Sequence, residues 1–203
     1  MNKRIPDFIK PYTGILWFLA LLFFFHFSWK IAIDGDMAGD MMYLFGKDIT
    51  PPWFLTLDRW LTQAVAWFVR LFPNTGDLIV EPQALRFPGN PGGIGIVWGC
   101  TGVKQIFIFT GIMLLYRGPF LKKLYYIPLG WLILTVYNVA RIGLIVILTN
   151  GHQERYNFLH DGIFRFIYYG IVFMLWVYWE EFIANKQQKN KINDERKGTN
   201  QSS

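Results

Sequence analysis

The sequence is poor in the residues that form disulfides and metal sites. It contains one cysteine, Cys100, so neither an internal disulfide nor a CxxC metal pair can form. It has only three histidines, and they do not cluster with carboxylates at the spacing of metal ligands. We therefore predict no metal site and no cofactor.

Charged residues are also scarce. Only 17% of the 203 residues are charged, whereas 53% are hydrophobic and 19% are aromatic. This composition excludes a disordered chain and argues against a small soluble domain. The formal net charge of +6 could suggest nucleic acid, but the basic residues lie at the N-terminus, in one short loop and in the C-terminal tail. That distribution is typical of membrane topology, so we predict a lipid bilayer and no nucleic acid as a partner.

Four apolar runs are long enough to cross a bilayer core, which takes roughly 18 to 20 residues. We predict an all-α integral membrane protein with transmembrane helices at 14–33, 94–116, 124–149 and 163–183. The first run follows basic residues, as a signal sequence does, but it is long and bulky and no small-residue cleavage site follows, so we interpret it as an uncleaved anchor. Residues 1–185 are predicted to form one membrane-embedded domain, and residues 186–203 a disordered basic tail.

Residues 53–72 are predicted to form an interfacial amphipathic helix rather than a fifth span. Apolar residues recur there at helical spacing, whereas polar residues that include Asp58, Arg59 and Thr62 share the other face. A helix with a charged face more naturally lies along the membrane interface. Residues 78–95 alternate briefly and then become rich in glycine and proline, which predicts an external loop with a short hairpin.

The positions of the basic residues predict the orientation of the chain. Cytoplasmic loops carry the excess of lysine and arginine. With four spans, this rule places both termini and the loop at 117–123 on the cytoplasmic side of the inner (cytoplasmic) membrane. The segments that hold most of the acidic residues then lie on the extracytoplasmic side.

Cys100 is the first candidate for chemistry. It lies in the segment Gly99-Cys100-Thr101-Gly102, where the glycines end and the firmly apolar part of the second span begins. Lys104 follows one turn later on the same predicted helical face. A thiol near a helix N-terminus and a cation is expected to have a lowered pKa, and the thiolate is the nucleophile. The alternative is that a lone cysteine in an apolar protein is a small core hydrophobe.

Arg141 is the second candidate, because it lies inside the third predicted span. An arginine within the membrane is costly and is a functional hypothesis by default. The alternative is an arginine that snorkels to the interface or pairs within the bundle. Asn138 is three residues earlier on the same face, so it can hold the guanidinium or line the same cavity.

His160 is the third candidate, because it immediately precedes the fourth predicted span and can act as a general base. Its neighbour Asp161 could orient an imidazole, but adjacent residues do not face each other on a helix, so it is a weaker candidate. The alternative for His160 is a solvated loop histidine. His152 in the same loop and His26 in the first span are rivals for the role of base.

The three candidates together indicate one type of reaction. A thiol, an imidazole and a fixed guanidinium on one side of the membrane supply a nucleophile, a base and a donor for a developing oxyanion. Acyl transfer through a thioester requires these three groups.

The order of the motifs resembles the exosortase and archaeosortase family of integral-membrane cysteine transpeptidases. The resemblance rests on Cys100-Thr101-Gly102, then Asn138-x-x-Arg141, then His160, and it covers mainly residues 95–178. It implies that Cys100 attacks a peptide backbone, Arg141 stabilises the tetrahedral intermediate and His160 transfers the proton. It also implies substrates with a C-terminal sorting signal, built from a short motif, a transmembrane helix and a basic cluster. Many family members have more spans, so this chain would be a minimal form.

Two other functions remain open from the sequence. One is a non-catalytic membrane subunit in exopolysaccharide or envelope assembly, in which Arg141 pairs with a phosphate or sugar carrier. The other is a membrane acyltransferase that uses His160 as base without a covalent cysteine. The first would tolerate the loss of Cys100. The second would lose activity without His160 but keep it without Cys100.

Overall fold

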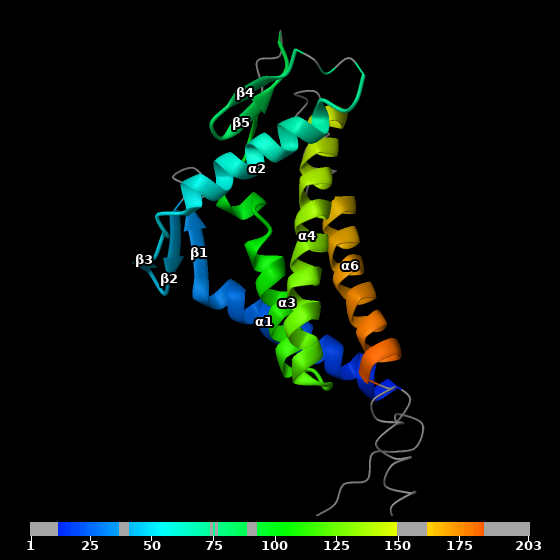
Figure 1. Ribbon diagram of the computed structural model, residues 1–203. Helices are drawn as coiled ribbons and strands as arrows, with labels where there is room; N and C mark the ends of the chain where they lie inside the picture. The colour runs from blue at the N-terminus through cyan, green and yellow to red at the C-terminus, as the bar shows by residue number, and fades with distance from the viewer. Residues whose placement is uncertain are drawn as a thin grey trace, which may run out of the picture.

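The computed structural model describes residues 12–36, 41–73, 75, 77–88, 93–149 and 162–184. The predicted tail at 186–203 lies outside these residues. The chain is mostly helical, which confirms the predicted all-α integral membrane class. Figure 1 shows α4 and α6 side by side, with α1 crossing near their lower end and α2 lying across the upper part of α4.

Within the described residues, three helices are long and apolar enough to cross a membrane. They are α1 (Thr13–Ala32), α4 (Phe120–Thr149) and α6 (Phe164–Trp179), which a π-helical turn (Glu180–Ala184) extends. These helices confirm the spans predicted at 14–33, 124–149 and 163–183. The side chains of Phe18, Tyr168 and Trp176 are among those that form the bundle core between them.

The span predicted at 94–116 is wrong as a continuous helix. Ile94–Gly95 is a short strand, β6, and Trp98–Cys100 is a 3-10 turn, η2. The α-helix, α3 (Val103–Leu115), has 13 residues and is therefore roughly 20 Å long, shorter than a bilayer core of about 30 Å. The run is apolar enough to span, but its glycines prevent one regular helix, and Cys100 precedes the helix instead of lying in it.

Helix α2 (Phe54–Val69) forms where the amphipathic helix was predicted. Three tryptophans spaced seven residues apart, Trp53, Trp60 and Trp67, are exposed along it. Tryptophans on an exposed edge beside polar residues are typical of a helix at a membrane interface. The predicted polar face is wrong in one part, because Asp58 and Thr62 are fully buried.

Two small antiparallel sheets flank α2. One contains β1 (Ile33–Asp36), β2 (Met41–Leu44) and β3 (Lys47–Asp48), and the other contains β4 (Ile79–Glu81), β5 (Ala84–Arg86) and β6. The second sheet begins with a hairpin in which Val80 pairs with Leu85. The predicted hairpin at 78–95 is thus confirmed, and a third strand joins it.

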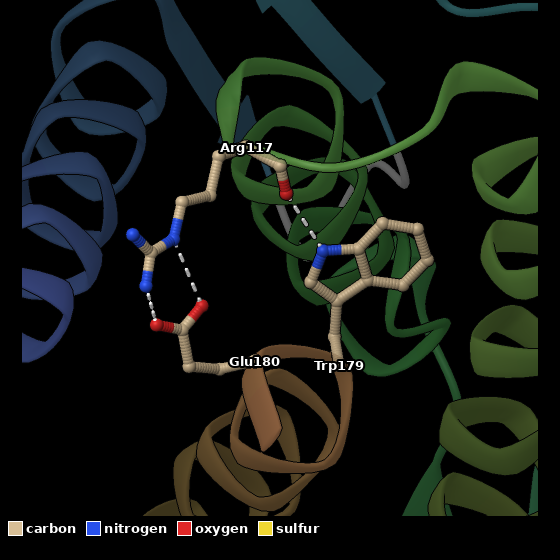
Figure 2. Close-up of polar contacts among 3 residues, drawn as sticks. All are labelled: Arg117, Trp179 and Glu180. Atoms are coloured by element: carbon tan, nitrogen blue, oxygen red, sulfur yellow. Dashed lines mark hydrogen bonds and ion pairs between the residues drawn. The ribbon is translucent and has the colours of Figure 1, made fainter. Parts of the chain in front are cut away.

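The lower end of the bundle is fastened by an ion pair. Arg117 lies in the turn between α3 and α4 and contacts Glu180 through two nitrogens. Its Nε lies 3.2 Å from Glu180 Oε2, and its Nη2 contacts Glu180 Oε1. Figure 2 shows this pair beside Trp179, whose indole Nε1 donates to the Arg117 carbonyl at 2.9 Å. The hydrogen bond with Glu180 is the main cause that raises the pKa of Arg117. Lys123, buried nearby, donates to the Leu114 carbonyl at 3.0 Å and to the Tyr116 carbonyl, so it caps the end of α3.

Candidate active site

The Cys100 segment is folded into a tight connection between β6 and α3. The Cys100 backbone N–H donates to the Val97 carbonyl at 2.7 Å, and the buried Thr101 hydroxyl donates to the Trp98 carbonyl at 2.6 Å. These bonds satisfy local polar groups that a helix would otherwise pair. Non-helical backbone at membrane depth is tolerated where protein buries it and satisfies its hydrogen bonds.

Gly102 turns the chain from the Cys100 segment into α3. Its φ of 79° lies in the left-handed region, where glycine adopts the conformation without steric cost. A Cβ atom at this position would lie 2.9 Å from the Tyr168 hydroxyl and 3.4 Å from the Asn138 amide nitrogen. Gly102 is therefore required both by the backbone conformation and by the approach of α4 and α6.

Asn138 joins the two sequence motifs in space. Its side-chain amide donates from Nδ2 to the Cys100 carbonyl at 2.7 Å, across 38 residues of sequence. Asn138 is buried, and so is Arg141, one turn further along α4, with 7% of its surface exposed. The structure thus places the Cys100 segment against the face of α4 that carries Asn138 and Arg141.

Apolar side chains form a cover beside the Cys100 segment. Cys100 is half-buried and packs against a cluster from α2, α4 and the β4–β5–β6 sheet. Val65 and Ile142 are among the fully or nearly fully buried members of this cluster. Gly143 lets α2 approach α4 closely, because a Cβ there would lie 2.4 Å from the Phe68 ring.

Two tyrosines at the site were not found from the sequence. Tyr168 of α6 is fully buried, donates to the Leu134 carbonyl at 3.2 Å and interacts electrostatically with Arg141. Tyr137 packs edge-to-face on Tyr168 at 5.1 Å and also interacts electrostatically with Arg141. The sequence gives no signal for either tyrosine, because the chain contains 10 tyrosines and 19 phenylalanines.

Lys104 does not share a helical face with Cys100, because Cys100 precedes the helix. The electrostatic partners of Lys104 include Lys30 of α1 and Arg165 of α6. His160 and Asp161 lie outside the described residues, so the structure places neither of them.

Comparison with known proteins identifies the family. The family model described as transmembrane exosortase (Exosortase_EpsH) matches residues 12–178. The chain belongs to the transmembrane exosortase family. The matched range includes the Cys100 segment, the Asn138-x-x-Arg141 motif on α4 and the apolar helices that embed this exosortase in the membrane. No curated protein and no solved structure matches the chain.

Proposed function

We propose that this exosortase is a membrane-embedded cysteine endopeptidase and transpeptidase that acts through a thioester at Cys100. Its substrates would be exported membrane proteins with a C-terminal sorting signal, made of a short motif, a transmembrane helix and a basic cluster. The observation that carries the proposal is the hydrogen bond from Asn138 to the Cys100 carbonyl. This bond brings the two family motifs together at one end of the bundle.

The first half of the reaction would cleave the substrate. His160 takes the thiol proton, and the Cys100 thiolate attacks the scissile carbonyl to give a tetrahedral oxyanion, which the Arg141 guanidinium stabilises by charge. The C–N bond then breaks, and the leaving amine takes the proton from the His160 imidazolium. The products are an acyl thioester on Cys100 and the released C-terminal helix of the substrate.

The second half would release the acyl group. An acceptor amine gives a proton to His160 and attacks the thioester carbonyl, the C–S bond breaks, and the thiolate recovers a proton from the imidazolium. With an amine as acceptor the reaction is transpeptidation, and with water it is proteolysis. The apolar side chains packed against Cys100 support transpeptidation, because an apolar surrounding disfavours attack by water.

The site is expected to face the extracytoplasmic side of the inner membrane. The first residues of α1, the turn at Arg117 and the end of α6 meet at one end of the bundle, since Gly14 lies beside Tyr116 and Glu180. The Cys100 segment lies toward the other end, below α2 (Figure 1). The positive-inside rule assigns the Arg117 end, with the basic loop, to the cytoplasm.

The proposal is tested by co-expressing the exosortase with a membrane protein that ends in a sorting signal. We expect wild type to process this protein and Cys100→Ala, Arg141→Ala and His160→Ala to abolish processing at equal membrane abundance. A covalent adduct between substrate and enzyme should be trapped only when Cys100 is present. Lys122→Ala, an exposed change at the opposite end, serves as the matched control and should process normally.

Two outcomes would contradict the proposal. Full processing by Cys100→Ala would exclude a covalent cysteine and would favour the non-catalytic assembly subunit. Loss of processing with His160→Ala alone, while Cys100→Ala remains active, would favour an acyltransferase that uses His160 as base.

A further inference from the structure

Three basic side chains converge from three different helices at the Cys100 end of the bundle. They are Lys30 near the end of α1, Lys104 in the first turn of α3 and Arg165 in the first turn of α6. Lys30 and Arg165 are exposed and Lys104 is half-buried. None of them has a role in the proposed reaction.

A hydrogen bond between α1 and α6 fixes two of these side chains near each other. His26 Nδ1 lies 3.1 Å from the Tyr169 hydroxyl. Lys30 lies one turn beyond His26 on α1, and Arg165 lies one turn before Tyr169 on α6. Helix α1 runs toward this end of the bundle, and α6 starts from it. Lys30 and Arg165 therefore both lie nearer to this end than the contact between His26 and Tyr169.

Aromatic contacts bring Lys104 to the same place. Trp29 of α1 packs on Phe107 of α3 with ring centroids 5.2 Å apart, and Phe25 packs edge-to-face on Phe107 at 5.6 Å. Lys104 lies one turn before Phe107, beyond this aromatic contact. Lys104 interacts electrostatically with Lys30 and Arg165, and His26 interacts with all three cations.

Three like charges close together attract an anion. Like charges repel more strongly near an apolar medium than in water, and the ends of apolar helices lie close to such a medium. The level at which membrane helices end is also the level of the lipid phosphates. A phosphate with several oxygens can accept hydrogen bonds from two ammonium groups and a guanidinium together.

An apolar groove begins beside Lys104, because the preceding residue, Val103, lines it. It has a volume of about 440 Å³ and follows α3 from Val103 to Leu115, between Phe25 of α1 and Trp131 of α4. Phe107 belongs both to this groove and to the aromatic contact below Lys104. A basic side chain beside an apolar groove matches a molecule with an anionic head and a hydrocarbon chain.

We infer that Lys30, Lys104 and Arg165 bind the phosphate of a membrane phospholipid whose acyl chain lies in the groove along α3. The headgroup would then lie next to the Cys100 segment, since Lys104 is only four residues from Cys100 in sequence. This site is independent of the proposed peptidase reaction. It is tested without any protein substrate.

The test measures binding of dioleoylphosphatidylglycerol to the full-length protein in detergent by native mass spectrometry. We expect Lys104→Gln and Arg165→Gln each to weaken binding about fivefold, and the double variant to weaken it further. Lys104→Arg should retain binding because it keeps the charge. Lys122→Gln, an exposed lysine at the other end, should bind as wild type does.

Further probes distinguish a phospholipid headgroup from free phosphate as the bound group. Dioleoylglycerol, which has the chains without the phosphate, should not bind, and inorganic phosphate at the same concentration should not displace the phospholipid. Leu114→Trp, which fills the groove, should weaken phospholipid binding while leaving the cations in place. Displacement by inorganic phosphate would show a free-phosphate site and overturn the lipid assignment. Equal binding by wild type and both glutamine variants would overturn the site itself.

Discussion

At the scale of single residues, Gly102 has the most constrained position near Cys100. We expect Gly102→Ala to lower the free energy of unfolding by about 1–3 kcal/mol, because a side chain is strained at a φ of 79° and its Cβ would meet the Tyr168 hydroxyl at 2.9 Å. Processing should fall with it, since the shift would move the Cys100 segment. Gly170→Ala is the matched control, because no atom lies within 4 Å of its Cβ. Both are measured by thermal unfolding in detergent and by processing at equal abundance.

Asn138 gives a second prediction at this scale. Asn138→Leu keeps the approximate volume but removes the donor to the buried Cys100 carbonyl, so it should cost about 1–3 kcal/mol of stability. Asn138→Asp, which keeps an oxygen but has no amide donor when ionised, should not restore activity. If Asn138→Leu processed substrate at the wild-type rate, the bond would not be needed to position Cys100.

Residues marked by chemistry stand out in the sequence more than residues marked by packing. Cys100 and Arg141 stand out because a lone thiol and an intramembrane arginine are rare, and Asn138 was found through its spacing from Arg141. Tyr168 could not be found, because its role depends on which of many aromatic side chains points at Gly102. Asp58 was assigned to the polar face by its charge, yet it is 0% exposed, because periodicity cannot show that a carboxylate lies inside a protein.

At the scale of elements, Gly143 lets α2 pack closely on α4. Gly143→Ala should push Phe68 away, because the new Cβ would lie 2.4 Å from its ring, and should loosen the cover over Cys100. We expect lower thermal stability and faster alkylation of Cys100 by a maleimide reagent. The double variant Gly143→Ala with Phe68→Ala should recover part of the stability, since the clash is gone. A double variant less stable than both single variants would argue against this contact.

The ion pair at the opposite end gives a prediction about how α6 is fastened. Arg117→Gln and Glu180→Gln should each lower stability by about 0.5–2 kcal/mol, a modest value because Arg117 is half-exposed. The double variant should lose less stability than the two single variants added together, since either change alone already breaks the ion pair. Strict additivity in thermal unfolding would mean that the two residues act independently.

Long elements were predicted from the sequence more fully than short ones. An apolar run of helical length specifies a span almost by itself, which is why α1, α4 and α6 match their predicted ranges. The range 94–116 failed because hydropathy does not weigh glycine conformations, and Gly102 ends the non-helical stretch with a positive φ. The strands β1 to β3 have only two to four residues each, so they depend on partners that a local pattern does not contain.

At the scale of the whole molecule, the two ends of the bundle differ in chemistry. The Arg117 end contains the basic turn with Lys122 and Lys123, whereas the other end contains Cys100, the amphipathic helix α2 and both sheets. This asymmetry permits a direct test of orientation. The single cysteine makes the test clean, because Cys100→Ser leaves a background without any thiol.

In that background, Phe45→Cys and Lys122→Cys are reporters for opposite sides. Phe45 is 74% exposed in the turn between β2 and β3, and Lys122 is exposed at the start of α4. We expect a membrane-impermeant maleimide to label Phe45→Cys on intact spheroplasts, and to label Lys122→Cys only after permeabilisation, because the positive-inside rule assigns the basic turn to the cytoplasm. The reverse pattern would place the Cys100 end in the cytoplasm. Exported substrates could not then reach the thiol, and the proposed peptidase would fail on topology even if Cys100 proved reactive.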